Sequence, residues 1–509
     1  MSGLAWQTPV TVSFDGYGNG SNTSLIGETP VSANLRAAVS DAIESVATFT
    51  NLDISLGNGA DATVRIASAD GLVHDGQTRW LGPGAFAFLP GNSALAGDIA
   101  FGNGTTDFAP GTYGHYTVLH EIGHALGLKQ PNEAGPHGRL AAADDSMMLS
   151  VMSARSVPGA PLSAGLTVEP EGFAQTFMPA DIAALQHMYG ADFSDRGNTV
   201  YRFDPAERVL FETIWDGGGR DTFDFSRYRD DLVVDLTPGA ATRTGQEAEL
   251  NRTERLANGA DPIYADGAIY NAFLFEGDTR SLIEDARAGA GDDLLRGNQA
   301  KNQLHGGDGG DTLEGFGAND RLFGQAGDDH VFGHGGHDRV DGGTGDDWLA
   351  GGGGRDTLVG RSGEDWLDGG AGVDRLVAGG GDDTLIGAGG HDTLLGQGGD
   401  DRLIGNTGAD RLDGGGGRDT LIGGKGGDTL TADEEGDRLI GGKGRDTFVV
   451  RDGGTITDLE RVDFLDLGNP DALATAVTIG HHVELETGSG ALVTLLHTDV
   501  QMLFDDMFL

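Results

Sequence analysis

The chain has 509 residues, no cysteine, and 79 acidic against 33 basic side chains, which gives a formal net charge of −46. A chain of this length is expected to form about three domains. The negative charge argues against nucleic acid and anionic membranes as partners and favours bound cations. Without cysteine there is no disulfide framework, and no apolar stretch is long enough to span a membrane.

Residues 1 to about 190 are predicted to form a mixed α/β domain. Ser32 is a candidate N-cap for a helix in which apolar residues recur at helical spacing up to Phe49. Strands are expected at 63–66 and 97–101, a helix around His120, and a last helix at 179–189 that ends at Gly190. The first residues lack the basic segment and apolar run of a signal peptide, so we expect none.

The sequence H-E-I-G-H at residues 120–124 is the strongest chemical motif in the chain. Its two histidines, His120 and His124, lie one helical turn apart on one face and can share a Zn²⁺ ion. Glu121 is then the candidate general base. Gly127 lies where the chain must turn sharply towards a further ligand. The alternative interpretation is two histidines on the surface of a helix.

A nine-residue repeat follows a connector of short strands and loops at 191–287. Eighteen units run without a gap from Ala288 to Val449, and seventeen of them have Asp at position six. Position eight is Leu in fifteen units and Val or Phe in the others. The pattern G-G-x-G-x-D-x-U-x is that of calcium-binding parallel β-rolls.

Each position of the repeat has a physical reason. The glycines let peptide carbonyls turn towards a shared ion, and the Asp supplies charge in an oxygen-rich site that suits Ca²⁺. The apolar eighth residue points inward, and only stacked neighbours can bury it. Because the carboxylates repel one another, the stack should need Ca²⁺ to close. A disordered Gly/Asp-rich linker would not keep so strict a frame.

The predicted calcium ligands are the regular sixth-position carboxylates. They are Asp293, Asp311, Asp320, Asp329, Asp338, Asp347, Asp356, Asp365, Asp374, Asp383, Asp392, Asp401, Asp410, Asp419, Asp428 and Asp446. Two units are irregular: Asn302 replaces the Asp in one, and the segment Ala432-Asp-Glu-Glu-Gly-Asp437 of the other has lost its turn glycines. We expect calcium to be weak or absent around these two.

These features together resemble the serralysins, which are secreted bacterial zinc endopeptidases of the metzincin clan. The resemblance rests on H-E-I-G-H, on Ser150-Val-Met152-Ser153, on the helix at 181–190 and on the trailing nonapeptides. It implies an α+β metzincin-like catalytic domain followed by an all-β right-handed parallel β-roll. It also implies one Zn²⁺, several Ca²⁺ ions and a protein or peptide substrate.

The resemblance assigns further roles along the chain. Met152 corresponds to the methionine turn beneath the zinc, and 97–101 to the edge strand that pairs with substrate backbone. A further calcium site between the domains is implied at Asp216, Gly218 and Asp221, which face Gly197 and Thr199. Serralysins leave the cell through a type I secretion apparatus that reads an uncleaved C-terminal signal, and Asp506-Met-Phe-Leu509 matches that signal.

We therefore expect four parts and an extracellular protein. They are a metzincin-like zinc peptidase domain at 1–190, a β-rich connector at 191–287, the β-roll at 288–449, and a C-terminal β segment with the secretion signal at 450–509.

Two positions depart from the family pattern. The third zinc ligand of H-E-x-x-H-x-x-G-x-x-H would be histidine at 130, where this chain has Gln130. An amide oxygen is neutral and binds zinc more weakly than imidazole does. Loss of a residue that only supports a metal ligand lowers metal affinity ~10–100-fold, so a changed ligand should lower it by at least as much. Ala154 replaces the tyrosine that ligates zinc and helps to stabilise the tetrahedral intermediate. Glu133 and His137 are alternative sources of the missing ligand.

Two functions follow from these residues. The first is a zinc-dependent endopeptidase in which Glu121 is the general base and His120, His124 and Gln130 hold the metal. The second is a catalytically inactive metzincin-like domain on a calcium-binding scaffold, which acts as an extracellular binding or surface protein. A lipase is disfavoured because the chain has no G-x-S-x-G nucleophile motif.

Overall fold

The computed structural model describes residues 5–7, 9–14, 23–58, 62–91, 96–133, 141, 145–155, 172–206, 211–245, 267–468, 477–479 and 482–496. Its contacts divide the chain into two compact units. Unit 1 contains residues 1–222 and 235–283, and unit 2 contains residues 223–234 and 284–509.

The main sheet of unit 1 has five strands in the order β3-β1-β4-β8-β7. These are β1 (Val10–Ser13), β3 (Ile54–Leu56), β4 (Val64–Ala69), β7 (Ala85–Ala87) and β8 (Ile99–Gly102). All neighbours pair in parallel except β7, which is antiparallel to β8. A smaller antiparallel sheet is formed by β2 (Thr23–Ile26), β5 (Gly71–His74) and β6 (Gln77–Trp80).

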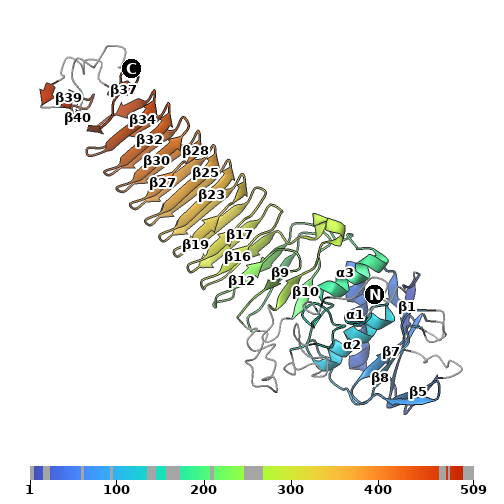
Figure 1. Cartoon of the computed structure of the whole chain (residues 1–509). Coiled ribbons are helices and arrows are strands. Elements are labelled where there is room, and N and C mark those ends of the chain that lie inside the picture. Colours follow the sequence, from blue (N-terminus) through green and yellow to red (C-terminus); the bar gives the residue numbers. More distant parts are fainter. Residues whose placement is uncertain are drawn as a thin grey trace. The chain divides into compact units, whose positions relative to one another are not determined.

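Three helices complete the described core of unit 1 (Figure 1). Helix α1 (Ala33–Phe49) begins after Ser32, whose hydroxyl accepts the N–H of Leu35 at 3.2 Å. Helix α2 (Tyr113–Ala125) packs against α1 and β7. Helix α3 (Pro179–Tyr189) ends at Gly190. The predicted helices and the strands near 63–66 and 97–101 are therefore confirmed.

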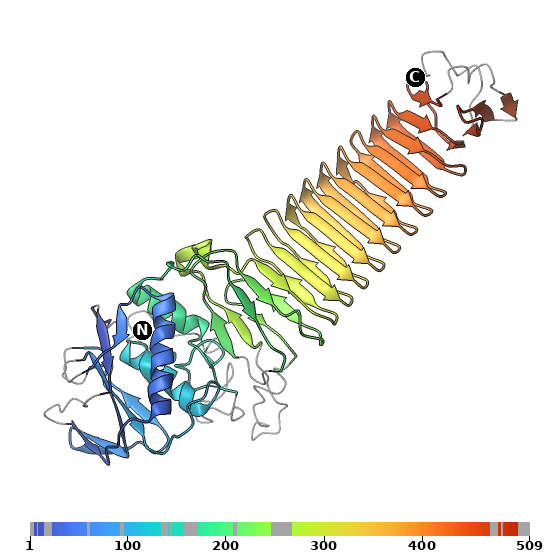
Figure 2. The same ribbon diagram turned by 180° about the vertical axis from the view of Figure 1, so that it is seen from behind.

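Unit 2 is a parallel β-roll, seen in Figures 1 and 2 as a ladder of short strands side by side. Successive repeats alternate between two sheets. One sheet contains β15 (Asp285–Arg287), β17 (Gln303–Asp308), β19 (Arg321–Ala326), β22 (Arg339–Thr344), β24 (Thr357–Ser362), β26 (Arg375–Gly380), β29 (Thr393–Gly398), β31 (Arg411–Gly416), β33 (Thr429–Ala432), β35 (Thr447–Val450) and β37 (Phe464–Asp466).

The second sheet runs beside the first. It contains β16 (Leu294–Arg296), β18 (Thr312–Glu314), β20 (His330–Phe332), β23 (Trp348–Gly354), β25 (Trp366–Gly372), β27 (Thr384–Ile386), β30 (Arg402–Thr407), β32 (Thr420–Gly426), β34 (Arg438–Gly444) and β36 (Gly454–Ile456), with β40 (Leu492–Leu496), β39 (His482–Glu486) and β38 (Val477–Ile479) at its end. The short β21 (Gly335–Gly336) and β28 (Gly389–Gly390) pair beside it.

The register of the roll follows the repeat. Strands in one sheet pair at an offset of two repeats, so that Leu304 lies opposite Leu322 and Leu349 opposite Leu367. The apolar eighth residue of each unit is fully buried between the sheets. The α+β domain and the parallel β-roll predicted from the sequence are thus confirmed. Within the described part of the chain, no helix has the length and apolar character needed to cross a bilayer.

Short strands and turns make up the connector between α3 and the roll. They are β9 (Val200–Arg202), β10 (Glu212–Ile214), β11 (Thr222–Asp224), β12 (Val233–Asp235), β13 (Ala241–Thr242), β14 (Ile269–Asn271) and the 3₁₀ turns η2 (Phe275–Gly277) and η3 (Thr279–Ser281). Strand β14 lies between β10 and β13 in a three-stranded sheet.

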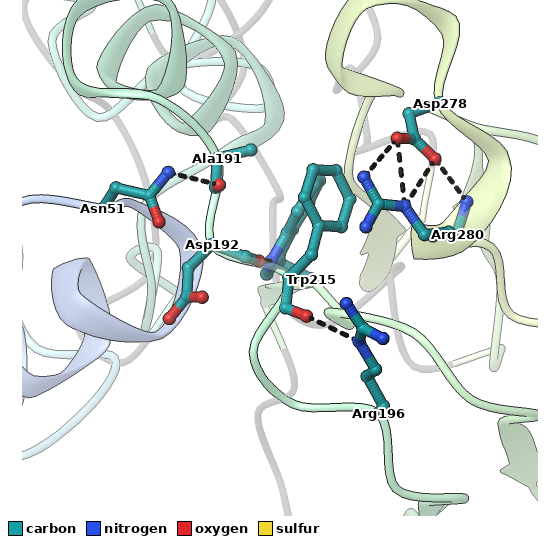
Figure 3. Close-up of polar contacts among 8 residues, drawn as sticks. Asn51, Ala191, Asp192, Arg196, Trp215, Asp278 and Arg280 are labelled. Atoms are coloured by element: carbon teal, nitrogen blue, oxygen red, sulfur yellow. Dashed lines mark hydrogen bonds and ion pairs between the residues drawn. The ribbon is translucent and has the colours of Figure 1, made fainter.

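The segment that follows α3 is fixed within unit 1 by polar and aromatic contacts (Figure 3). Asn51, just beyond α1, donates to the carbonyl of Ala191 at 2.8 Å. Trp215 donates to the carbonyl of Asp192 at 3.2 Å and packs on Phe193. The guanidinium of Arg280 lies over the Phe193 ring, 3.9 Å from its centre. These contacts hold the start of the connector against the helical part of unit 1.

Candidate metal centres

The H-E-I-G-H motif lies in α2, whose ends are set by local sequence. Thr112 caps its N-terminus by accepting the N–H of His115 at 3.3 Å. The helix stops after Ala125, and Gly127 turns the chain away with a φ of 104°, a conformation that favours glycine. Gly123 is required for packing, since a Cβ there would lie 2.6 Å from the sulfur of Met152. The methionine turn therefore lies against the centre of the motif.

His120 and His124 are held in the same way. Their ring centres lie 4.7 Å apart, at an interplanar angle of 88°. The Nδ1 of His120 hydrogen-bonds the carbonyl of Val151 at 2.8 Å, and that of His124 the carbonyl of Leu128 at 2.9 Å. A carbonyl can only accept, so each Nδ1 carries the proton and each Nε2 keeps its lone pair for a metal.

Burial keeps both imidazoles neutral. It lowers the pKa of His120 to about 4, with a smaller contribution from His124, and it lowers the pKa of His124 as well. Neutral imidazole is the form that ligates zinc, so the two side chains fit a zinc ion.

The methionine turn, residues 150–153, is anchored from below by Asp181 of α3. One carboxylate oxygen accepts the hydroxyl of Ser150 at 2.6 Å, and the other accepts the N–H of Val151 at 2.7 Å and of Met178 at 3.1 Å. Asp181 is 2% exposed, and its burial raises its pKa to about 7. Because the carbonyl of Val151 orients His120, Asp181 supports a candidate metal ligand indirectly, through Val151.

Glu121 is buried on the same helix. Loss of hydration raises its pKa to about 7, while a backbone hydrogen bond from Ala87 and the charge of Arg79 act in the opposite direction. A carboxyl with a pKa near neutrality can both take up and release a proton at physiological pH.

The contact with Ala87 places Glu121 beside β7, and β7 is the edge of the sheet. The expectation that 97–101 forms the edge strand is wrong. Strand β8, which contains this segment, has β4 on one side and β7 on the other. The short β7 could not be distinguished in sequence from the loops around it.

The third zinc ligand is not evident among the described residues. No three His, Cys, Asp or Glu side chains in this part of the chain come together as a metal cluster. Gln130 is half-buried, and its carbonyl accepts the N–H of Glu133 in a tight turn. Burial lowers the pKa of His124, and the charge of the Glu133 carboxylate opposes this lowering in part, so Glu133 acts electrostatically on the motif. His137 lies outside the described residues. Ala154 follows the methionine turn, and its methyl side chain cannot bind a metal.

The sixth-position carboxylates of the roll form two hydrogen-bonded ladders. In each ladder the Oδ1 atom accepts the N–H of the residue eighteen positions earlier, at 2.7–2.9 Å, from Asp293→Asp311 to Asp428→Asp446. The Oδ2 atom is buried and has no hydrogen-bond donor in Asp311, Asp320, Asp329, Asp338, Asp347, Asp356, Asp365, Asp374, Asp383, Asp392, Asp401, Asp410, Asp419, Asp428 and Asp437.

A buried carboxylate oxygen without a donor requires a cation or a proton. Rows of such oxygens at glycine-rich turns are a donor set that fits Ca²⁺.

Three positions differ from this regular pattern or extend it. Asp293 has both oxygens occupied, by the N–H groups of Leu232 at 2.7 Å and Gly289 at 3.3 Å. The side-chain amide of Asn302 donates to the carbonyl of Glu284 at 2.7 Å, so this side chain has a hydrogen-bond partner without a bound ion. Asp437, in the unit without turn glycines, accepts the N–H of Asp419 and has a buried Oδ2 without a donor, as the regular ladder members do, and it also accepts a backbone hydrogen bond from Glu434.

The residues of the implied connector calcium site come together in unit 1. Asp216 accepts the N–H of Gly218 at 2.8 Å and the hydroxyl of Tyr201 at 2.7 Å. Asp221 accepts the N–H of Thr199 at 2.7 Å. The loops touch closely, because a Cβ on Gly219 would collide with the carbonyl oxygen of Gly197.

Sequence reasoning missed Asp181, Val151 and Leu128 at the zinc motif, and Asp437 in the roll. The last could have been found, since it stands at position six of its unit. The carbonyls of Val151 and Leu128 have no side-chain signature. Asp181 was visible only as an acidic residue in the first turn of a helix.

The chain matches two family models. Residues 180–246 match the peptidase M10 serralysin C-terminal family, and eight segments between 282 and 453 match the RTX calcium-binding nonapeptide repeat. The fold and these repeats define an RTX β-roll protein with a metzincin-like α+β domain.

Similarity to individual proteins narrows this class. The chain is 35% identical over 252 residues to the metalloprotease AprA of Pseudomonas entomophila (strain L48), covering 44% of this chain and 46% of that protein. It is 32% identical over 285 residues to serralysin G of Dickeya chrysanthemi (52% and 53%) and 31% identical over 252 residues to the metallopeptidase AprA of Pseudomonas marginalis (44% and 46%). The chain spans about half the length of the curated relatives it matches. Its repeats and the segment from α3 into the connector are similar to those of serralysin-type proteins.

Proposed function

We propose that the chain is a secreted, calcium-stabilised zinc endopeptidase that acts on protein or peptide substrates. One observation carries the proposal: on a single helix, two half-buried histidines have their Nδ1 atoms fixed on carbonyls, and a buried carboxyl of near-neutral pKa follows the first of them in sequence. The similarity to metalloproteases supports it.

Zinc would be held by the Nε2 atoms of His120 and His124, with the amide of Gln130 or the carboxylate of Glu133 as the third ligand. A bound zinc ion supplies Lewis acidity and lowers the pKa of water. Glu121 accepts the proton that the attacking water loses and passes it to the leaving amine. The edge strand β7 lies beside Glu121 and pairs with an extended substrate backbone.

We assign residues 1–190 to the peptidase part, 191–287 to the connector, 288–449 to the calcium-binding roll and 450–509 to the C-terminal segment. We also propose export by a type I apparatus that reads the end of the chain. The support is the sequence Asp506-Met-Phe-Leu509, which lies outside the described residues. Deletion of these four residues should retain the protein inside cells that carry such an exporter, and secretion at normal yield would contradict the assignment.

The test of the enzyme proposal is the zinc content of calcium-loaded protein, followed by casein hydrolysis. Glu121→Gln should abolish hydrolysis and leave zinc bound. The matched control is Glu44→Gln, an exposed position on α1 that should change neither quantity.

The substitutions at Gln130 and Ala154 favour a second candidate, a metzincin-like binding protein without activity. If wild-type protein binds zinc stoichiometrically and cleaves no protein or peptide substrate, this second function replaces the first.

A further inference from the structure

Unit 2 contains a pocket of about 790 Å³ at the first turns of the roll. The loop Ser226–Arg229 forms one wall. Arg287 and the turn after it form another, and His305, Asp308 and Gln325 complete the lining. Its volume lies within the ~300–1,000 Å³ typical of small-molecule sites. The pocket borders the first turns of the repeat, because Ala288–Ala290, Gly307 and Asp308 belong to it, and it does not depend on the proposed peptidase function.

The pocket gathers positive charge in a strongly acidic chain. Arg227, Arg229 and Arg287 line it, and Asp308 is the one acidic side chain among its lining residues. Arg229 and Arg287 are exposed, and neither forms an ion pair with any residue that the structure describes. In a chain with 79 acidic side chains, two exposed guanidinium groups on the lining of one pocket are left available to an anion.

The walls of the pocket are held in place before any ligand arrives. Phe225 donates to the carbonyl of Arg287 at 2.8 Å, and Ala290 donates to that of Tyr228 at 3.0 Å. These bonds tie the arginine-bearing loop to the first strand of the roll. A preformed site loses less entropy on binding than a loose one.

His305 is also fixed, and it gives the pocket a polar wall. Its ring stacks on Phe323 with centres 4.6 Å apart at 10°, and its Nε2 lies 2.8 Å from the amide nitrogen of Gln303. Burial, followed by the charge of Arg287, lowers its pKa. The arginines therefore supply the charge, while His305 and Gln325 share a side-chain hydrogen bond and form a neutral polar wall.

We propose that this pocket binds a hydroxylated small molecule that carries a phosphate or sulfate monoester, such as a sugar phosphate. Planar guanidinium groups bind tetrahedral oxyanions through paired hydrogen bonds, and several of them can share the oxygens of one phosphate. The carboxylate of Asp308 and the hydroxyl of Ser226, which also line the pocket, suit the hydroxyl groups of the same molecule. Free sugar phosphates and phosphorylated lipid headgroups share this chemistry.

The experiment is calorimetric titration of the calcium-saturated full-length protein with glucose 6-phosphate, glucose 6-sulfate and glucose. A second arm measures co-sedimentation with phosphatidylcholine vesicles, with and without phosphatidylinositol 4-phosphate. The two esters should bind and glucose should not. Arg229→Ala and Arg287→Ala should each weaken binding about tenfold or more, since each removes charge-assisted hydrogen bonds. Arg339→Ala, an exposed change on β22 outside the pocket, is the matched control and should leave binding unchanged.

Binding confined to the vesicles, with the same dependence on Arg229 and Arg287, supports the site and assigns it to a lipid headgroup. Absence of binding to both esters and to the phosphoinositide vesicles overturns the proposal. So does ester binding that is equal in wild type and in both variants. If the wild type binds no ester and the arginine variants lose roll stability, the arginines have only a structural role at the end of the roll.

Discussion

Each candidate zinc ligand in α2 depends on a backbone carbonyl that fixes its ring. For His120 this carbonyl belongs to the methionine turn, and Asp181 holds that turn from α3. What the chain lacks are the further ligands that serralysins have at the positions of Gln130 and Ala154. The frame of a zinc site is therefore better preserved than its full set of ligands, and single substitutions can test the two separately.

Gln130→His should tighten zinc binding at least about tenfold, because it completes three nitrogen ligands and leaves one position open. Adding Ala154→Tyr should raise peptidase activity further, by supplying a donor for the developing oxyanion. Competition with a chelating dye measures zinc affinity, and hydrolysis of casein measures activity. Gln130→Ala is the control and should weaken zinc. A double variant that binds zinc fully but cleaves nothing would favour the binding-protein function.

Asp181→Asn should weaken zinc about 10–100-fold, because the amide cannot accept from both Ser150 and Val151 and so releases the turn that orients His120. Stability should fall by about 1–3 kcal/mol for the buried group left unsatisfied. Zinc titration and thermal unfolding measure the two quantities. Asp41→Asn, exposed on α1, should alter neither. Unchanged zinc affinity in Asp181→Asn would limit this residue to a structural role.

Among the strands of the roll, the carboxylate ladder explains why each turn needs both oxygens of its Asp. Oδ1 caps a backbone N–H of the same sheet edge, while Oδ2 is buried without a donor. Asparagine can replace the first function but not the second. Asn302 shows the natural form of this exchange, since its amide has found a carbonyl instead.

Asp365→Asn should therefore keep the strand register but remove calcium from the adjacent turns. We expect fewer bound calcium ions per chain and a higher calcium concentration for folding, as read by metal analysis and by circular dichroism during calcium titration. The matched control is Asp346→Asn, at an exposed fifth position whose Oδ1 also caps a backbone N–H. Equal calcium content in both variants would show that Oδ2 does not ligate.

The sequence predicted most of the fold because the repeat and the helices are encoded locally. The nine-residue frame alone sets the two sheets and the buried row of eighth-position residues. It did not reveal that β7 covers β8, or that Asp181 reaches Val151, since both are tertiary contacts between distant segments. The pair of histidines could be predicted from helical spacing. The carbonyls that fix them were not, because a carbonyl has no residue identity.

Over the full chain, the charge of −46 makes the fold sensitive to cations and to pH. In the calcium-free chain, burial raises the pKa of Asp311 to about 8, of Asp320 and Asp347 to about 7 and of Asp365 to about 6. The folded roll thus binds protons more tightly than the unfolded chain, whose carboxyls titrate near ~3.9. This contribution to stability is present at low pH and is lost as pH rises through these folded values.

Calcium-depleted protein should accordingly protect its roll peptides from hydrogen exchange better at pH 5 than at pH 8, after correction for the intrinsic exchange rates. Millimolar calcium should restore protection at pH 8, because it replaces the protons on the same oxygens. Mass spectrometry of residues 288–449 measures this. Equal protection at both pH values without calcium would contradict the assignment of the raised pKa values to the roll.

The ladders also have a polarity. Each buried sixth-position N–H points to the carboxylate of a later turn, whereas exposed fifth-position N–H groups, such as that of Glu364, point to the carboxylate of an earlier turn, here Asp346. The buried donors of each turn are therefore completed by the turn that follows in sequence. The regular series closes outside the repeats, where Asp463 accepts the N–H of Asp446 at 2.9 Å and Asp458 accepts the N–H groups of Gly441 and Gly442. A chain cut at its N-terminal turns would expose carboxylates that water can solvate. A chain cut before Asp458 would leave buried N–H donors without an acceptor. The roll therefore depends more on the segment that closes its C-terminal end than on its N-terminal turns.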